Sequence, residues 1–300
     1  MRASCGCHTF LILVSLAEGG LQAADEVEPA PLPNQLTIQA PPADWNLSPF
    51  YRKCILLGEF PIVSSADVHD AALQEAAFVV SRMLAHRPDV LAELARARVR
   101  LAVMSWRERT LDIPEHNDLT PASYWNRRAR GLGATSIRPA VSCGEENLLE
   151  YPGDPYLTES ILVHEFAHAI DLMALRSLSP EFQQELSSTF DAAREAGLWE
   201  GKYAGKNPEE YWAEGVQSYF DTNREDDHDH NHVNTRHELA EYDPRLFALI
   251  DREFRGVSWR YLKPSARPAA DREHLTGYDP VAAPHFAWEP APAAPVPTDQ

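Results

Sequence analysis

The sequence predicts an α+β fold: a small mixed sheet with an edge strand packed on a helix, followed by a mainly helical C-terminal subdomain. Two observations lead to this prediction. The first half of the chain holds short apolar segments rich in β-branched residues, which are typical of strands. The second half holds apolar residues at helical spacing, and proline and glycine residues separate these segments.

Three segments of the first half are expected to form strands. Residues 54–63 are almost continuously apolar, and residues 99–104 alternate in a way that indicates a half-buried strand. The third strand is expected at 137–143. Because Pro139 has no N–H to donate to a neighbouring strand, we expect 137–143 to lie at an edge of the sheet.

Helices are expected where capping residues precede an apolar helical period. The clearest start is Asn207-Pro208-Glu209-Glu210, which combines a cap, a proline at the first position and a glutamate at the third, as in a capping box. The expected helices cover residues 67–86, 88–97, 121–130, 154–177, 180–196, 208 onward and 244–254.

The charge balance excludes one large class of function. Lys and Arg supply 27 residues and Asp and Glu 45, so the net charge is −18. A nucleic-acid-binding protein needs clustered basic residues to neutralise phosphates, and anionic membranes attract basic surfaces as well. No run beyond the N-terminus approaches the ~20 apolar residues of a membrane span. We therefore expect no nucleic-acid partner and no membrane span, while the expected peptide or protein partner follows from the motifs described below.

The N-terminus predicts export to a secreted or periplasm-like location. Arg2 precedes an apolar run at 10–17, and small residues follow before Ala24, as in a signal peptide. The expected division of the whole chain is a signal peptide at 1–23, a proline-rich leader at 24–49, a folded domain at 50–263 and a Pro/Ala-rich tail at 264–300.

Two cysteines remain after the predicted signal peptide. Cys54 and Cys143 could form one disulfide in an oxidising compartment, or could both be buried free thiols. Neither belongs to a Cys-x-x-Cys pair, so a cysteine-based metal site is excluded.

The segment that points most directly to chemistry is an HExxH motif. His164 and His168 are four residues apart, so on a helix both imidazoles lie on one face and can share one Zn²⁺. Glu165 lies beside them and can deprotonate a zinc-activated water. Residues 161–175 are apolar nearly all round, which indicates a buried helix whose ionisable groups need partners such as a metal.

A catalytic zinc requires a third protein ligand. Asp171 lies on the same face as the motif, but its side chain starts one turn beyond the metal, so a supporting role or an alternative ligand role is expected for it. Glu210 and Glu214 are four apart on the helix that follows Asn207. Spacing alone leaves open which of the two binds the metal, and both could instead be capping or surface charges.

A second motif gives the zinc site a family context. Tyr203 is followed after six residues by Glu210, two aromatic residues, alanine and Glu214. Together with the HExxH at 164–168, this pattern resembles the catalytic domain of anthrax lethal factor and of the Pro-Pro endopeptidases, which are gluzincin-type zinc metallopeptidases. The resemblance covers about 136–255, less than half of the chain.

The resemblance implies specific roles for the residues that match. Both motif histidines would bind zinc, Glu165 would be the general base and Glu210 the third ligand. Tyr203 would stabilise the oxyanion, and Glu214 would hold a ligand histidine by its free ring nitrogen. Residues 50–263 would then form a zincin-like metallopeptidase domain.

A cluster of histidines and carboxylates at 225–232 lies outside that pattern. In an extended strand His228, His230 and His232 would face one side and could bind a second divalent ion, but such clusters are also found as solvated charge. His237 follows closely and could be a second oxyanion donor or a surface residue.

The function predicted from these motifs is an exported zinc-dependent endopeptidase, a hydrolase that cleaves peptide bonds through a zinc-activated water. We expect the peptide to add as a β-strand along the edge near 137–143. One alternative is a catalytically inactive metallopeptidase-like protein that binds peptides or metal. Another is an exported metal-binding protein whose working part is the cluster at 225–232.

Overall fold

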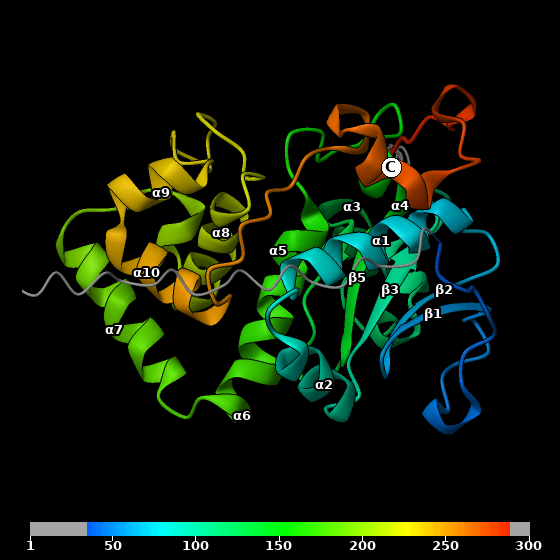
Figure 1. The fold of residues 1–300 in the computed structure, drawn as a ribbon, viewed down its shortest axis with the longest axis horizontal. Helices are drawn as coiled ribbons and strands as arrows, with labels where there is room; N and C mark the ends of the chain where they lie inside the picture. Colours follow the sequence, from blue (N-terminus) through cyan, green and yellow to red (C-terminus); the bar gives the residue numbers. More distant parts are fainter. Residues whose placement is uncertain (1–34, 289–300) are drawn as a thin grey trace, which may run out of the picture. The chain divides into compact units, whose positions relative to one another are not determined.

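The first half of the chain is organised around a mixed sheet in the computed structural model, which describes residues 35–288 (Figure 1). The sheet has five strands in the order β1-β2-β3-β5-β4. β2, β3 and β5 are parallel to one another, while β1 and β4 are antiparallel to their neighbours. The strands are β1 (Lys53–Leu57), β2 (Phe60–Ser64), β3 (Arg100–Met104), β4 (Gly131–Leu132) and β5 (Ala140–Gly144).

Helices follow the strands of the first half and make up most of the second half, which confirms the predicted α+β class. The helices are α1 (Asp70–Met83), α2 (Pro88–Arg96), α3 (Ala122–Arg128), α4 (Glu145–Leu148), α5 (Ile161–Ile170), α6 (Arg176–Leu178), α7 (Phe182–Glu195), α8 (Pro208–Tyr219), α9 (Arg236–Tyr242) and α10 (Pro244–Glu253). A π-helical turn, Asp171–Leu175, joins α5 to α6. Within the described residues, none of these helices combines the length and apolarity needed to cross a bilayer. The predicted signal peptide, residues 1–23, lies outside them.

Both faces of the sheet are covered. One face carries Ile62, Leu101 and Val141, which lie side by side on β2, β3 and β5, and it packs against α1, α2 and α5 (Figure 1). The opposite face carries Cys54 and Met104 in a smaller apolar cluster. β3 is therefore buried on both sides apart from its first residue, and the expectation of a half-buried strand is wrong because a second cluster covers its other face.

The predicted strand at 54–63 is in fact a hairpin of β1 and β2. Its turn includes Gly58 at φ 58°, a left-handed conformation that glycine adopts without a Cβ clash. Both strands are buried and apolar, so the sequence of the hairpin looks like one continuous apolar strand and the turn is hard to recognise.

The expected edge position of 137–143 is also wrong. Its strand, β5, lies between β3 and β4, and the two-residue strand β4 forms the edge. Pro139 precedes β5 and contributes only its carbonyl, which accepts from the N–H of Arg100 at 3.1 Å. A proline at the start of a strand needs no edge.

The two cysteines are free and buried. Cys54 lies on β1 and Cys143 on β5, three strand spacings apart, which is about 14 Å. They also belong to clusters on opposite faces of the sheet, so the disulfide is not formed. Burial raises the pKa of the Cys54 thiol to about 11, which keeps it protonated and unreactive.

The helix that carries the HExxH motif is shorter than expected. It begins at Ile161, because the Asn147 side chain accepts from the N–H of Ile161 at 3.0 Å and Ser160 is the N-cap. The predicted start at Asp154 caps a separate turn, in which its carboxylate accepts from the N–H of Tyr156 at 2.9 Å. The same capping chemistry thus marks a turn rather than the helix.

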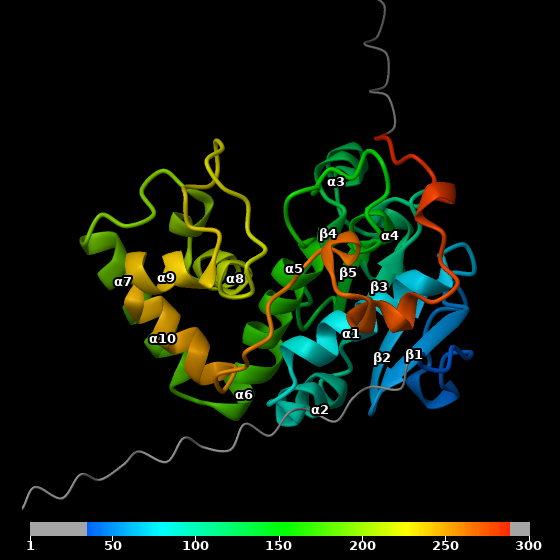
Figure 2. The same cartoon turned by 45° about the horizontal axis from the view of Figure 1, so that its top comes forward.

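Helix α8 lies at the centre of the helical subdomain and packs against α5, α9 and α10 (Figure 2). The Trp212 indole donates to the carbonyl of Ala167 at 2.9 Å, which ties α8 to the HExxH helix. Gly215 permits the close packing of α10, because a Cβ there would come within 2.6 Å of the Leu246 side chain. The subdomain therefore holds α8 firmly against α5.

The predicted tail boundary at residue 263 falls inside the packed part of the chain. Arg267 is buried and donates to both carboxylate oxygens of Glu75 on α1, at 2.6 and 2.8 Å. His274 contacts the same carboxylate at 2.8 Å. This buried cluster attaches the segment after 263 to α1.

The predicted leader, 24–49, is likewise packed from residue 35 onward. The backbone of Leu36 exchanges two hydrogen bonds with the side chain of Gln74, at 2.9 and 2.7 Å. Trp45 is only 8% exposed and belongs to the main apolar core. These residues are part of the fold rather than an extended leader.

Replacing Glu75 with glutamine is expected to destabilise the protein by ~3–5 kcal/mol, because Arg267 would remain buried without a carboxylate. Burial favours the neutral form of Glu75, but His274 and Arg267 hold its pKa below the ordinary value. The stabilisation is therefore present at neutral pH and is lost as the pH falls through that lowered pKa. Urea unfolding at neutral and acidic pH measures both effects.

Glu273→Gln is the matched control, because Glu273 is exposed on the same C-terminal segment. Equal unfolding free energies for the two variants at neutral pH would contradict this role of Glu75.

Candidate active site

Three side chains from α5 and α8 converge on one point. The Nε2 atoms of His164 and His168 are 3.2 Å apart, and each lies 3.3 Å from Oε2 of Glu210. The three side chains are only 9%, 13% and 19% exposed. The structure thus brings together two imidazole nitrogens and one carboxylate oxygen, all within 4.8 Å of one another.

This group of atoms fits a divalent metal ion. Oε2 of Glu210 is buried and accepts no hydrogen bond, although a buried carboxylate oxygen without a partner is costly. Burial opposes ionisation of Glu210, yet the neighbouring histidines hold its pKa well below the ordinary range. Two nitrogens and one oxygen are the donor set of a catalytic zinc site with one open position.

The start of α8 places Glu210 at this point. The Asn207 side chain caps the helix by accepting from the N–H of Glu210 at 2.8 Å, and Pro208 occupies the first turn. The predicted cap is confirmed. In a full capping box the Glu210 carboxylate would turn back to the cap, whereas here it faces His164 and His168.

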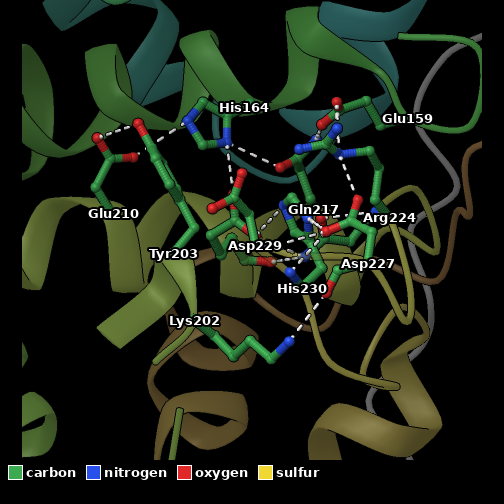
Figure 3. Close-up of polar contacts among 12 residues, drawn as sticks. Glu159, His164, Lys202, Tyr203, Glu210, Gln217, Arg224, Asp227, Asp229 and His230 are labelled. Carbon is green, nitrogen blue, oxygen red and sulfur yellow. Dashed lines mark hydrogen bonds and ion pairs between the residues drawn. The ribbon is translucent and has the colours of Figure 1, made fainter. Parts of the chain in front are cut away.

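The other ring nitrogen of His164 is held by a residue that the sequence analysis did not identify. Nδ1 lies 2.8 Å from Oε1 of Gln217 (Figure 3). The nearest oxygen of Glu214 is 3.4 Å away. An amide oxygen can only accept, so Nδ1 carries the proton and Nε2 is left free to bind a metal. Gln217 follows Glu210 by seven residues and so lies on the same face of the helix. This spacing is the feature of the sequence that could have indicated its position near His164.

Glu214 has partners of its own. Its Oε2 accepts from the Asn223 amide at 3.0 Å and lies 3.3 Å from Nε2 of His230. The structure therefore brings Glu210, and not Glu214, to the Nε2 atoms of the motif histidines. Glu214 also keeps the expected contact with Nδ1 of His164, at 3.4 Å, beside the shorter contact from Gln217.

The histidines of 225–232 do not converge. This segment forms bends rather than a strand; the His228 side chain is 96% exposed, and His232 lies edge-on to Tyr242. Only His230 is buried, and it bonds Asp227 at 2.8 Å through Nδ1. Within residues 35–288, the group at α5 and α8 is the one cluster with metal-binding geometry, so the expected second ion site is not formed.

Two further predicted candidates lie apart from the metal-ligand group. Asp171 is buried in the π-helical turn, where the Arg176 guanidinium donates to both its oxygens at 2.8 and 3.1 Å. His237 is 81% exposed and pairs with Glu241 on the surface. Asp171 is thus a structural ion-pair partner. His237 is a surface residue, which was the second of the two roles considered for it.

A cavity of about 270 Å³ adjoins the metal-ligand group, and His164, Glu165 and Tyr203 line it. Burial raises the pKa of the Glu165 carboxyl. The Tyr203 hydroxyl donates to Oε1 of Glu210 at 3.1 Å (Figure 3). Burial and the Glu210 charge raise the pKa of Tyr203 to about 12, so this hydroxyl remains a donor at neutral pH.

The edge strand β4 runs directly beside α5 because it contains glycine. A Cβ on Gly131 would lie 3.0 Å from Cγ of Glu165, and one on Gly133 would lie 2.8 Å from Cβ of His168. Both glycines follow the helix that was expected at 121–130. They bring the sheet edge next to the HExxH side chains.

Comparisons with known proteins identify no family. No protein-family model matches the sequence, and neither does any curated protein. Among solved structures, the fold is similar to that of the PRO-PRO endopeptidase PPEP-2 from Paenibacillus alvei. The identity is 15% and the TM-score 0.43, and the match covers 64% of this chain and 96% of that chain. A likeness at this level assigns neither activity nor substrate.

Replacing Gln217 with methionine is expected to weaken zinc binding by about 10- to 100-fold, because the proton on Nδ1 of His164 would lose its acceptor. Zinc affinity is measured by competition with a chromophoric chelator. Gln184→Met, at an exposed position on α7, is the matched control and should bind zinc as wild type does. Unchanged affinity in Gln217→Met would contradict this role of Gln217.

Proposed function

We propose that the protein is a zinc-dependent endopeptidase of the gluzincin type. The observation that carries the proposal is the orphaned Oε2 of Glu210 facing two histidine nitrogens. Glu165 and Tyr203 line the adjoining cavity, where a substrate carbonyl could reach both. This is the set of groups that peptide-bond hydrolysis needs: a metal site, a base and an oxyanion donor.

His164, His168 and Glu210 would hold the ion. A zinc ion bound there supplies Lewis acidity, which polarises the scissile carbonyl and lowers the pKa of water. Glu165 takes a proton from the attacking water and returns it to the leaving amine. The raised pKa of Glu165 suits both steps, because an effective base has a pKa nearer the working pH.

Tyr203 completes the proposed chemistry. Its hydroxyl keeps its proton at neutral pH, so it can donate to the oxyanion that develops on the substrate carbonyl. The bond to Glu210 holds the hydroxyl at the edge of the metal-ligand group. Because the hydroxyl has a single proton, it would turn from Glu210 to the oxyanion during the reaction, while its oxygen stays beside the metal-ligand group.

The substrate in this proposal is an extended peptide that adds to the free edge of β4. Backbone pairing along an exposed strand is a common mode of peptide recognition. Gly131 and Gly133 lie beside Glu165 and His168, so a peptide paired with β4 would pass over the candidate metal site. This edge replaces the 137–143 segment expected from the sequence. Export, predicted from residues 1–23, belongs to the same proposal.

Glu165→Gln is expected to retain zinc and to lose about 10²- to 10⁴-fold in turnover, because the amide cannot accept the proton. The measurement is a peptide-library digest with zinc-loaded protein, read by mass spectrometry, alongside zinc quantification. Glu195→Gln, at an exposed position of α7, is the control and should cleave as wild type does.

Two results would count against the proposal. Cleavage by Glu165→Gln at the wild-type rate would exclude Glu165 as the base. A wild-type protein that holds zinc but cleaves no peptide would favour the inactive, peptide- or metal-binding alternative.

A further inference from the structure

The cavity beside the metal-ligand group has a basic residue that the proposed chemistry does not use. Arg128 is the last residue of α3 and lines this cavity together with His164, Glu165 and Tyr203. Its side chain thus borders the same space in which a substrate would react.

Aromatic side chains hold this guanidinium in place. It lies 5.9 Å from the ring centroid of Tyr124 and 5.8 Å from that of Trp125, both within cation–π range. It also interacts with the hydroxyl of Tyr203 and with the charge of Glu165, both of which line the same cavity. These contacts orient the guanidinium without an ion pair among the described residues.

The other basic residue of the cavity is already neutralised. Nε of Arg224 lies 3.2 Å from Glu159 and 3.4 Å from Asp227. No carboxylate forms an ion pair with Arg128 anywhere in the described residues 35–288. A guanidinium carries five N–H donors in a planar fork that matches a carboxylate. Arg128 therefore retains donors for an anionic group of a ligand.

Two carboxylates of the cavity have partners other than Arg128. Glu159 is paired with Arg224, and Glu214 is bonded by Asn223 and His230. Glu165 also borders the cavity and its charge acts on Arg128, but among the described residues the two side chains form no ion pair, so the guanidinium keeps donors for a ligand.

The position of Arg128 relative to β4 selects one side of the substrate. Antiparallel pairing is the more stable arrangement per residue, and a peptide antiparallel to β4 would have its C-terminal side near the start of that strand. Arg128 comes three residues before Gly131, which lies beside Glu165. Arg128 would therefore contact residues that follow the cleaved bond.

We propose that Arg128 binds a carboxylate of the peptide substrate on the C-terminal side of the cleaved bond. The carboxylate belongs either to an Asp or Glu side chain or to the free C-terminus of a short peptide. Arg128 is then a specificity-determining residue for the peptidase activity proposed above, on which this inference rests.

The test separates binding from cleavage. A randomised octapeptide library is made once with free C-terminal carboxylates and once as C-terminal amides. Each library is passed over immobilised, zinc-loaded Glu165→Gln protein, which binds without turnover, and the retained peptides are identified by mass spectrometry. The same is done with Arg128→Gln and with Arg107→Gln added to Glu165→Gln. Arg107 lines a different cavity and stacks on Trp106, so it is the matched control.

We expect carboxylate-bearing peptides to be enriched about tenfold, the scale of one charge-assisted bidentate contact. Arg128→Gln should abolish the enrichment, and Arg107→Gln should keep it. Enrichment of Asp and Glu in both libraries identifies a side-chain carboxylate, while enrichment confined to the free-acid library identifies the C-terminus. No enrichment, or one that survives Arg128→Gln, would overturn the inference.

Digestion of the same libraries by the wild-type protein separates the two proposals. Cleavage without preference for carboxylates leaves the peptidase standing and overturns the role of Arg128. Enrichment that depends on Arg128, with no cleavage by the wild type, supports carboxylate binding and contradicts the peptidase.

Discussion

The packing of α8 against α5 is the contact on which the candidate site depends. Neither helix alone holds three converging ligand atoms, because the two histidines come from α5 and the carboxylate of Glu210 from α8. The Trp212–Ala167 hydrogen bond fixes one face of this contact. Gln217 fixes the imidazole of His164 from the same helix that carries Glu210. One helix–helix interface thus sets both the ligand positions and the ring tautomer.

The second constraint is the close approach of the sheet edge to α5. Gly131 and Gly133 leave no side chain between β4 and the HExxH residues. Arg130, immediately before the strand, is buried and donates to both oxygens of Glu146, at 2.5 and 2.9 Å, and to the carbonyl of Ser105. This ion pair anchors an edge strand of only two residues. The sheet edge formed by β4 and the metal-ligand group are therefore held in a fixed position relative to each other.

Local chemistry predicted the parts of this arrangement that depend on near neighbours in sequence. Such chemistry predicts the Asn207 cap and the helix that carries Glu210. It also predicts that the two histidines, four residues apart, lie on one face of a helix. The start of α5 was misplaced because Asn147, a distant residue, shares its capping. Gln217 and the edge strand β4 were missed for a related reason: their roles arise only when α8 and the sheet pack against α5.

The central claim is that α5 and α8 bind one zinc ion, and anomalous diffraction at the zinc edge from zinc-loaded crystals tests it most directly. The account predicts a single strong peak at about 2.0–2.2 Å from the Nε2 atoms of His164 and His168 and from the Glu210 carboxylate. Absence of a peak there, or a peak held instead by the histidines of 225–232, would contradict it.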